Sequence, residues 1–388
     1  MSYSRRDFLS HLSLGLGSVA MLPGLAMIDS TKRFLAAAGL AELPENEKLG
    51  VALVGLGRYA TGQLAPALQE TKLCKLSGIV TGTPRKEKEW ARKYDLPESN
   101  IYNYETYDQV ADNDDIDIIY VVLPNSMHAE YSIRAAEAGK HVICEKPMAT
   151  SVRDCQQMID ACQKAGRKLS IGYRLHFEPY NKEMMRLGRQ EVLGAAEQMS
   201  GAHSFPLNDP DAWRLDKEMA GGGPLMDVGI YVIQAGLYTI GQLPVSVMAW
   251  DETQNPDNFP EVEGTIRWDL NFPNNVVLHG ESSYEDRGNN FRLEASDGWA
   301  ELSPAYSYSG IRGDTSEGPM DFPQVNQQAL QMDDFARCIL EDDQTIVLGE
   351  MGKRDMIIME AIYESADTGQ EVPLNFDKEE GYIRPLAG

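Results

Sequence analysis

The chain has 388 residues, of which 43% are hydrophobic, and a formal net charge of −24. This length allows two domains with a sizeable core, and the apolar content is that of an ordinary globular protein. The excess of 59 acidic over 35 basic residues argues against nucleic acid or an anionic membrane as a partner, because phosphate binding needs a basic surface. It is typical of a surface suited to an acidic or salty environment.

Residues 1–41 are predicted to form a twin-arginine export signal and a short arm. The paired arginines occur in Ser4-Arg5-Arg6-Asp7-Phe8-Leu9, and a moderately apolar stretch over 12–26 follows. That stretch is too short for a membrane span, so no membrane anchor is expected. Twin-arginine signals mark bacterial proteins that are exported after folding. We therefore expect a periplasmic or otherwise exported protein that meets the twin-arginine export machinery.

The cysteines do not indicate a metal site. They are five in number, Cys74, Cys144, Cys155, Cys162 and Cys338. Their spacings fit no zinc ligand set. A protein that folds in a reducing compartment before export does not need disulfides, so most of these thiols are expected to be buried.

An α/β nucleotide-binding domain is predicted over 46–172. It begins with a continuous apolar run over 49–54, which is typical of a buried parallel strand. Helices are expected over about 58–70, 84–93, 126–138 and 152–165, between strands over 75–80, 116–123, 141–144 and 169–172. This alternation is that of a doubly wound parallel sheet.

A glycine motif joins the first strand to the first helix. It reads Gly55-Leu56-Gly57-Arg58-Tyr59-Ala60, which is G-x-G-x-x-A in the strand-turn-helix context of a dinucleotide fingerprint. The first glycine permits a tight turn, the second lets the backbone approach a pyrophosphate, and the alanine lets helix and strand pack closely. The predicted cofactor contacts here are Gly55, Gly57, Arg58, Tyr59 and Ala60.

The end of the second strand favours NADP over NAD. Enzymes that use NAD place an acid there for the ribose hydroxyls, whereas this chain has Thr81-Gly82-Thr83-Pro84-Arg85-Lys86. Hydroxyls and two cations suit a 2′-phosphate. The predicted contacts at this end of the cofactor are Thr81, Gly82, Thr83, Arg85 and Lys86.

Beyond residue 172 the pattern changes to alternating polar and apolar segments. Strands are predicted over 265–272, 276–281 and 291–302, with a hairpin-like turn at 273–275. Helices over 327–341 and 350–365 follow. We expect 173–388 to form an α+β domain around a mostly antiparallel open sheet, with C-terminal helices that pack back.

Three short segments carry the predicted chemistry. They are Cys144-Glu145-Lys146-Pro147 at the end of the strand over 141–144, Gly221-Gly222-Gly223-Pro224, and the pair Asp227 and Tyr231. Residues four apart on a helix share one face. A lysine, a carboxylate and a phenol brought together are the groups needed to move a proton while a hydride moves to a nicotinamide ring.

These segments together resemble the Gfo/Idh/MocA oxidoreductase superfamily, and within it the periplasmic glucose–fructose oxidoreductase branch. Further support comes from Leu123-Pro124-Asn125-Ser126-Met127-His128-Ala129-Glu130, Ile171-Gly172-Tyr173-Arg174 and Trp213-Arg214-Leu215. The resemblance covers roughly 50–373. It implies additional cofactor contacts at Pro124, Asn125, His128, Glu145, Lys146, Tyr173, Arg174, Trp213 and Arg214.

The resemblance also implies catalytic roles. Lys146 is expected near the nicotinamide and the reacting carbon, with a cis bond to Pro147. Tyr231 is expected to be the acid/base, where most of the superfamily has histidine, and Asp227 to hold the sugar or orient Lys146. The predicted sugar-binding residues are Lys146, His176, Asp227 and Tyr231. Relatives pair through the open sheet face, so a homodimer or homotetramer is expected.

The implied function is that of an exported NADP-dependent sugar oxidoreductase. It would oxidise an aldose such as glucose to a lactone and reduce a ketose such as fructose to an alditol in a ping-pong cycle. One departure is the arm before the first strand, which is long in the glucose–fructose enzymes and here spans little more than 42–48. Two alternatives therefore remain: a dehydrogenase or anhydrofructose-type reductase with exchangeable cofactor, and a cofactor-assisted glycosidase of the same fold.

Overall fold

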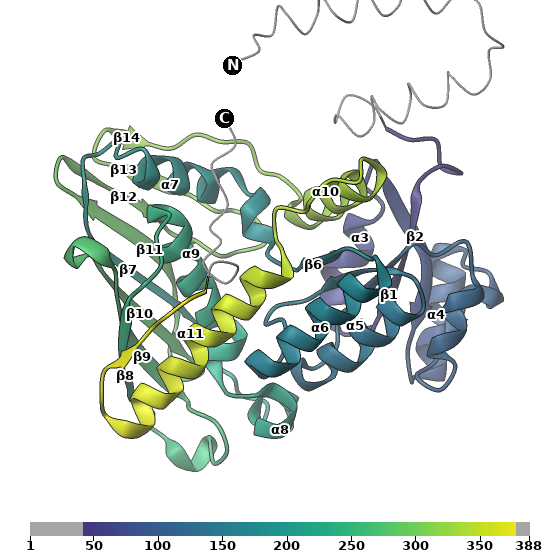
Figure 1. The fold of residues 1–388 in the computed structure, drawn as a ribbon, viewed down its shortest axis with the longest axis horizontal. Helices are drawn as coiled ribbons and strands as arrows, with labels where there is room; N and C mark the ends of the chain where they lie inside the picture. The colour runs from purple at the N-terminus through teal and green to yellow at the C-terminus, as the bar shows by residue number, and fades with distance from the viewer. Residues whose placement is uncertain (1–41, 378–388) are drawn as a thin grey trace, which may run out of the picture.

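The computed structural model describes residues 42–377, so the predicted export signal in 1–41 lies outside the described residues. Two sheets, each with its own helices, stand beside each other, and the helix α11 (Gly349–Thr368) runs between them (Figure 1). The first sheet is built from the chain before residue 172 and the second from the chain after it. The predicted combination of an α/β and an α+β part is confirmed.

The first sheet has six parallel strands in the order β3-β2-β1-β4-β5-β6. They are β1 (Leu49–Val54), β2 (Cys74–Val80), β3 (Ile101–Tyr102), β4 (Ile118–Val121), β5 (His141–Cys144) and β6 (Leu169–Ile171). The chain moves outward from β1 to β3 and then returns to the other side of β1. Dinucleotides bind at the crevice that this reversal leaves outside the carboxyl ends of the strands, so the Rossmann prediction is confirmed.

The helices of this half are α3 (Ala65–Ala67), α4 (Pro84–Tyr94), α5 (His128–Glu137) and α6 (Val152–Ala165). The first differs from the prediction of a helix over 58–70, because a π-helical turn, η1 (Ala60–Leu64), precedes α3 and the helix ends at Ala67. The backbone N–H of Ala65 bonds to the carbonyl of Ala60, five residues back. Pro66 accounts for the change, since it has no N–H to donate and its ring crowds the carbonyl four residues earlier.

The second sheet has nine strands in the order β14-β13-β12-β11-β7-β10-β9-β8-β15, and all neighbours are antiparallel except β7 and β10. They are β7 (Ala196–Ser204), β8 (Ser246–Asp251), β9 (Thr265–Asn271), β10 (Val277–Ser283), β11 (Gly288–Ala295), β12 (Gly298–Leu302), β13 (Gly313–Thr315), β14 (Gly318–Pro319) and β15 (Val372–Pro373). The predicted strand region over 291–302 is therefore a hairpin of two strands. The central strand β7 was not predicted.

The helices of the second half are α7 (Pro179–Arg189), α8 (Lys217–Ala220), α9 (Ile230–Ile240), α10 (Gln327–Leu340) and α11. Helix α9 is buried over almost its whole length, and it packs against β7 and β10. Helix α10 returns to the first half of the molecule, where Met332, Phe335 and Ala336 share a core with Val51 and Leu53. The two halves are therefore joined by apolar packing as well as by the chain.

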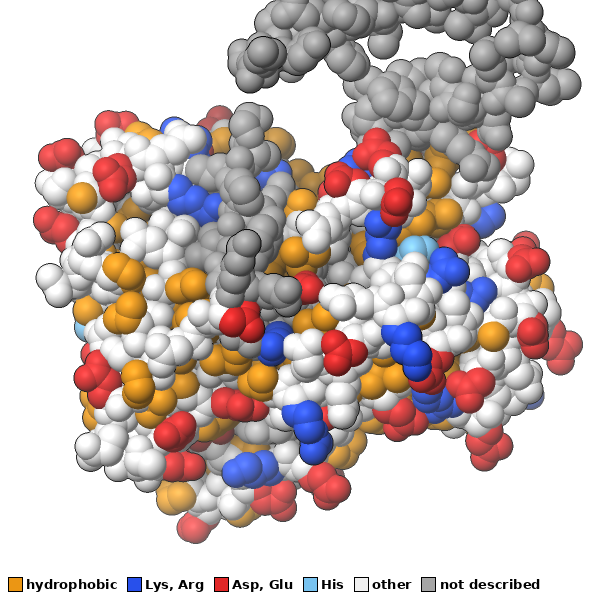
Figure 2. Space-filling model, viewed as in Figure 1, with side chains coloured by type: hydrophobic (Ala, Val, Ile, Leu, Met, Phe, Trp, Pro, Cys, Tyr) orange, Lys and Arg blue, Asp and Glu red, His pale blue; other side chains and the backbone are white. Residues whose placement is uncertain are grey.

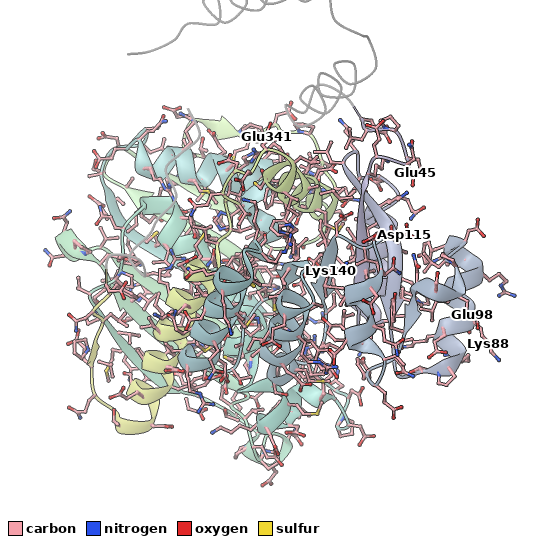
Figure 3. All side chains as sticks on the ribbon, turned by 45° about the vertical axis from the view of Figure 1, so that its right-hand side comes forward. Glu45, Lys88, Glu98, Asp115, Lys140 and Glu341 are labelled. Carbon is pink, nitrogen blue, oxygen red and sulfur yellow. The ribbon has the colours of Figure 1, made fainter. Side chains whose placement is uncertain are left out.

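On the face seen in Figure 2, charged side chains of both signs are spread over both halves. Glu45 and Glu98 lie at the outer edge of the first half, pointing away from the sheet (Figure 3). All five cysteines are buried and unpaired, as expected. Within 42–377, no helix combines the length and the apolarity of a membrane span.

Candidate active site

The glycine turn after β1 is shaped to receive a diphosphate. Gly55 has φ +93°, and a Cβ at this position would lie 2.4 Å from the Val122 carbonyl oxygen, so only glycine fits. A Cβ on Gly57 would instead meet nothing within 4 Å. The turn therefore presents open backbone at the start of a helix, which is the arrangement that binds the pyrophosphate of a dinucleotide.

The end of β2 brings one of the two predicted cations to this turn. Lys86 Nζ donates to the Leu56 carbonyl at 2.7 Å, which places the ammonium beside the glycine motif. The side chain of Arg85 is 74% exposed and pairs with Glu89. No acidic side chain stands between Thr81 and Lys86, the segment in which NAD-dependent enzymes place an acid for the ribose hydroxyls.

Lys146 follows β5, and its bond to Pro147 is cis, as expected. Lys146 Nζ donates to the Asp227 backbone carbonyl at 2.6 Å and lies 3.7 Å from Asp227 Oδ1. The other carboxylate oxygen of Asp227, Oδ2, accepts from Arg214 Nε at 2.8 Å and from the Tyr284 hydroxyl at 3.2 Å. Burial alone would raise the pKa of Asp227, but Arg214 and Lys146 hold it below its ordinary value. Asp227 is thus a carboxylate fixed between two cations.

Asp227 lies in a π-helical turn, η7 (Leu225–Gly229), that continues into α9. Within this turn the N–H of Ile230 bonds to the carbonyl of Leu225, five residues back. Such turns disturb the regular ladder of helical hydrogen bonds and occur often at functional sites. Here the disturbed stretch is the one whose carbonyl at Asp227 accepts the hydrogen bond from Lys146.

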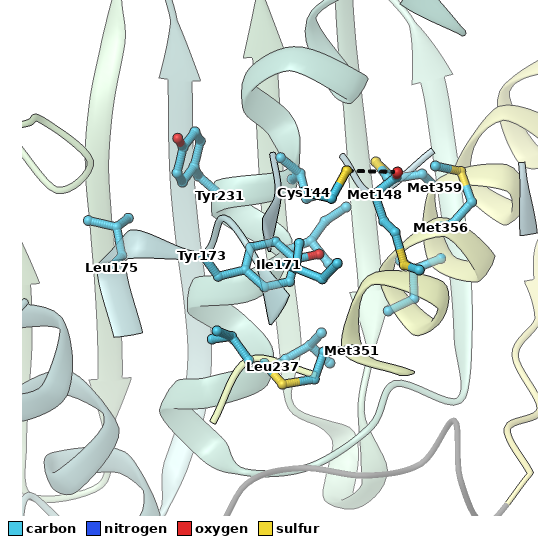
Figure 4. Close-up of a cluster of buried hydrophobic side chains, with 14 of the residues drawn as sticks. Cys144, Met148, Ile171, Tyr173, Leu175, Tyr231, Leu237, Met351, Met356 and Met359 are labelled. Carbon is cyan, nitrogen blue, oxygen red and sulfur yellow. Dashed lines mark hydrogen bonds between the residues drawn. The ribbon is translucent and has the colours of Figure 1, made fainter. Parts of the chain in front are cut away.

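Tyr231 follows on the first turn of α9, and two cations face its ring. The ring centroid lies 4.9 Å from Lys146 Nζ and 5.1 Å from Arg174 Cζ. Figure 4 shows Tyr231 at the edge of a buried cluster that contains Cys144, Ile171 and Tyr173. The structure therefore brings together Lys146, Asp227 and Tyr231. Their catalytic roles remain predictions.

Arg174 connects this group to the second sheet. Its guanidinium donates to Gln327 Oε1 and to the carbonyls of Tyr306 and Ser307. Burial alone would lower the pKa of Arg174, but the phenols of Tyr231, Tyr59 and Tyr308 raise it above its ordinary value. Arg174 therefore places a permanent positive charge against Tyr231.

Two further tyrosines line the same space. The rings of Tyr59 and Tyr308 lie 5.6 Å apart, and Arg174 Cζ is 4.5 Å from the centre of the Tyr308 ring. Tyr59 belongs to the glycine motif, whereas Tyr308 comes from the loop after β12. Residues from both halves of the molecule thus meet at the carboxyl end of the first sheet.

Several predicted cofactor residues are engaged in supporting contacts. Both ring nitrogens of His128 lie against carbonyls, Nδ1 2.8 Å from that of Pro147 and Nε2 2.9 Å from that of Leu123, and burial lowers the pKa of His128 to about 4. Asn125 donates to the Ala220 carbonyl. Glu145 accepts from the Tyr120 hydroxyl at 2.6 Å, and burial raises the pKa of this carboxyl group.

Tyr173, His176 and Trp213 also have defined neighbours. The Tyr173 hydroxyl donates to Asp355, and His176 Nε2 lies 2.9 Å from Gln234 Oε1 in the core. The Trp213 ring lies 4.5 Å from Arg214 Cζ. The sugar contact predicted for His176 stays a prediction.

His203 is a residue of this site that sequence reasoning missed. It lies on β7, with its ring 5.2 Å from that of Tyr231 and 4.9 Å from that of Tyr306. Burial lowers its pKa to about 3, so the imidazole is neutral. Its Nδ1 has no hydrogen-bond partner among the described residues. The strand that carries it, β7, consists mostly of small and polar residues. It therefore lacks the alternation of apolar and polar residues by which a strand is recognised in a sequence.

The sheet, the open glycine turn and the lysine–tyrosine pair define an NAD(P)-binding oxidoreductase with a separate domain over the nicotinamide end. Comparison with known families agrees. The chain matches the oxidoreductase family with an NAD-binding Rossmann fold, Gfo/Idh/MocA, over residues 49–173, and the Gfo/Idh/MocA C-terminal domain over residues 182–301. The chain belongs to the Gfo/Idh/MocA family, as its motifs indicated.

Three similar proteins cover most of the chain. The solved structure of aldose–aldose oxidoreductase from Caulobacter crescentus is 44% identical, with a TM-score of 0.82, and the match covers 84% of this chain and 100% of that one. The NADP(+) D-xylose 1-dehydrogenase of Haloarcula marismortui is 29% identical and covers 84% of this chain and 92% of its own. A second such enzyme, from Haloferax volcanii, is 28% identical over 70% of this chain and 85% of its own.

Replacement of Gly57 by alanine tests the glycine turn. Because the new Cβ meets no protein atom, Gly57→Ala is expected to fold with unchanged thermal stability. The methyl group would occupy the space where a diphosphate approaches the backbone, so cofactor affinity should fall at least about tenfold (~1.4 kcal/mol). Titration of nicotinamide cofactor by calorimetry measures this.

Gly62→Ala is the matched control, since Gly62 lies on the next turn and its Cβ also meets open space. Equal cofactor affinity of the two variants would contradict the assignment of the turn.

Proposed function

We propose that the protein is an NADP-dependent sugar oxidoreductase that oxidises the anomeric carbon of an aldose and returns the hydride to a second sugar. The observation that carries this proposal is the meeting of Lys146 and Tyr231, with the Lys146 ammonium 4.9 Å from the centre of the phenol ring. This pair lies at the carboxyl end of the Rossmann sheet, on the side of the open glycine turn. This position supports the assignment of Tyr231 as the group that exchanges a proton with a sugar hydroxyl beside the cofactor.

The chain's own residues supply binding and proton transfer. The nicotinamide, when bound, accepts or returns the hydride. The phenolic oxygen of Tyr231 takes the proton from the hydroxyl on the reacting carbon and gives it back in the return step. Lys146 and Arg174 place two positive charges against the phenol ring during this exchange, and Asp227 holds Lys146 in place. The partly buried setting strengthens these electrostatic interactions.

Support for sugars as substrates comes from the similar proteins. The oxidoreductase that is 44% identical is described as acting between two aldoses, and the two haloarchaeal enzymes as D-xylose dehydrogenases. An aldose as donor agrees with all three. For the acceptor, the first favours a second aldose over the ketose implied by the sequence resemblance.

A conventional dehydrogenase with exchangeable cofactor is the second candidate. The two D-xylose dehydrogenases favour it, as does the short segment before β1. That segment packs its Leu43 into the core of the first half. Bound cofactor in the purified protein separates the two candidates.

Export through the twin-arginine machinery and assembly into a homodimer or homotetramer belong to the same proposal. The paired arginines near the N-terminus support export. A protein that recycles its own bound cofactor needs no free NADP, which agrees with activity outside the cytoplasm. The open nine-stranded sheet offers a face for self-association.

The two-sugar cycle is tested without added cofactor. Purified protein mixed with D-glucose and D-xylose is expected to form aldonic acid and alditol in equal amounts over many turnovers, as measured by chromatography. Formation of product only when NADP is supplied would favour the second candidate. Cofactor released by denaturation and identified by mass spectrometry should be NADP(H).

Replacement of Tyr231 by phenylalanine tests the proton carrier. Tyr231→Phe should lower kcat by about 10²–10⁴-fold, the range for loss of a general acid/base, and leave cofactor binding intact. Tyr180→Phe is the control, because the buried phenol of Tyr180, on α7, donates to the Phe322 carbonyl. This variant should keep near-normal kcat. Equal kcat in both variants would remove Tyr231 from the mechanism.

Replacement of Lys86 by methionine tests the choice of cofactor. Loss of a charge-assisted contact of about 1.5–3 kcal/mol should weaken NADP binding about tenfold or more, with little change for NAD. Lys88→Met removes the same charge from an exposed position two residues later and should leave both affinities unchanged. A parallel loss for NADP and NAD in Lys86→Met would show that Lys86 only supports the turn.

A further inference from the structure

We propose that Glu263 is the positioning residue for Asp227 and Tyr231, and that it acts by fixing the start of the helix that carries both. This inference rests on the proposed function, since it assigns how the catalytic pair is held opposite Lys146. Glu263 lies in the loop before β9, only 9% exposed, and is far from the other site residues in sequence. Sequence reasoning did not single it out.

The Glu263 carboxylate accepts hydrogen bonds at both oxygens. Oε2 accepts from the backbone N–H of Gly223 at 2.9 Å. Oε1 accepts from the backbone N–H of Leu225 at 3.1 Å and from the Tyr363 hydroxyl at 3.0 Å. The buried Glu263 side chain thus connects the start of β9 to three segments: the glycine run 221–223, the first turn of the helix that carries Asp227 and Tyr231, and α11.

These two amides are the ones that the start of the helix leaves free. The first N–H groups of a helix have no partner within the helix, and Pro224, which stands between the two donors, has no N–H at all. A carboxylate at this end also complements the helix dipole. Asp227 and Tyr231 lie within two turns of this point, so the position of the helix start sets where both side chains lie.

The three glycines are explained by the same contacts. A Cβ on Gly222 would lie 2.0 Å from the Tyr363 hydroxyl, and a Cβ on Gly223 would lie 2.3 Å from the Glu263 carbonyl. Gly221 has φ +80°, and its Cβ would lie 2.9 Å from Thr150 Cγ2. The backbone can therefore run directly against these groups only if it carries no side chains.

Thr150 connects this arrangement to the other catalytic group. It stands four residues after Lys146, on the same turn beyond β5. The glycine run is thus packed between the turn that carries Lys146 and the carboxylate of Glu263. A shift of the helix start would change the distance between Lys146 and the Asp227 carbonyl, and small misplacements of reacting groups lower rates strongly.

The test compares Glu263→Gln and Glu263→Ala with a matched control. Glutamine keeps one acceptor oxygen but places an NH₂ group against a backbone N–H, so kcat should fall about tenfold, with sugar KM and cofactor affinity changed less than threefold. Alanine removes both acceptors and should lower kcat further, so that glutamine gives partial rescue. Asp333→Asn is the control, because Asp333 also accepts from two backbone amides, those of Lys72 and Leu73, and should leave kcat unchanged.

Amide hydrogen exchange provides a readout that does not depend on the substrate. Exchange over 222–231 should be faster in Glu263→Gln than in the unmodified protein, and unchanged in Asp333→Asn. Tyr363→Phe, which removes one donor and preserves the helix contacts, should give a smaller effect of the same kind. Unchanged exchange over 222–231 in Glu263→Gln, or equal kcat in Glu263→Gln and Asp333→Asn, would overturn the inference. Faster exchange in a protein without sugar turnover would overturn only the proposed function.

Discussion

The hydrogen bond from Lys146 Nζ to the Asp227 carbonyl is the interaction on which the site depends. At 2.6 Å it joins the turn after β5 of the Rossmann sheet to the π-helical turn η7, which continues into α9 in the second half. A buried ammonium is costly unless it is paired and hydrogen-bonded. Asp227 meets this requirement with its backbone carbonyl and its carboxylate, and Arg214 pairs with the other oxygen of the same carboxylate. The two halves therefore cannot move apart without exposing or unpairing these charges.

The surroundings of this contact keep both sides fixed. On the Lys146 side, the neutral ring of His128 lies between the carbonyls of Leu123 and Pro147, and its one N–H donates to one of them. On the Asp227 side, Arg174 and Glu263 connect the helix to the loops of the second sheet. Most of these contacts join buried polar groups. Removal of one partner therefore leaves the other buried without a hydrogen bond, which is destabilising. Rigid placement of a few groups is what acid/base chemistry beside a cofactor requires.

The parts of this arrangement that follow local rules could be predicted from the sequence. The first strand, the glycine turn and the presence of a helix after it were predicted because a continuous apolar run followed by G-x-G-x-x-A has one common structure, although the helix was expected to reach residue 70. Lys146, Asp227 and Tyr231 were expected to lie together because they stand in motifs, and the structure brings them together. His203 and Glu263 were missed, because β7 is built of small and polar residues and because the bonds of Glu263 join positions about 40 residues apart. The π turns were missed because helical periodicity does not show an extra residue per turn.

The most direct test of the account is a crystal structure of the protein with bound NADP and an aldose. The account predicts the anomeric oxygen of the sugar within hydrogen-bond distance, about 3 Å, of both Lys146 Nζ and the Tyr231 hydroxyl, with the diphosphate over Gly57. A sugar bound away from this pair, or a Tyr231 hydroxyl that faces the core with the sugar in place, would contradict it.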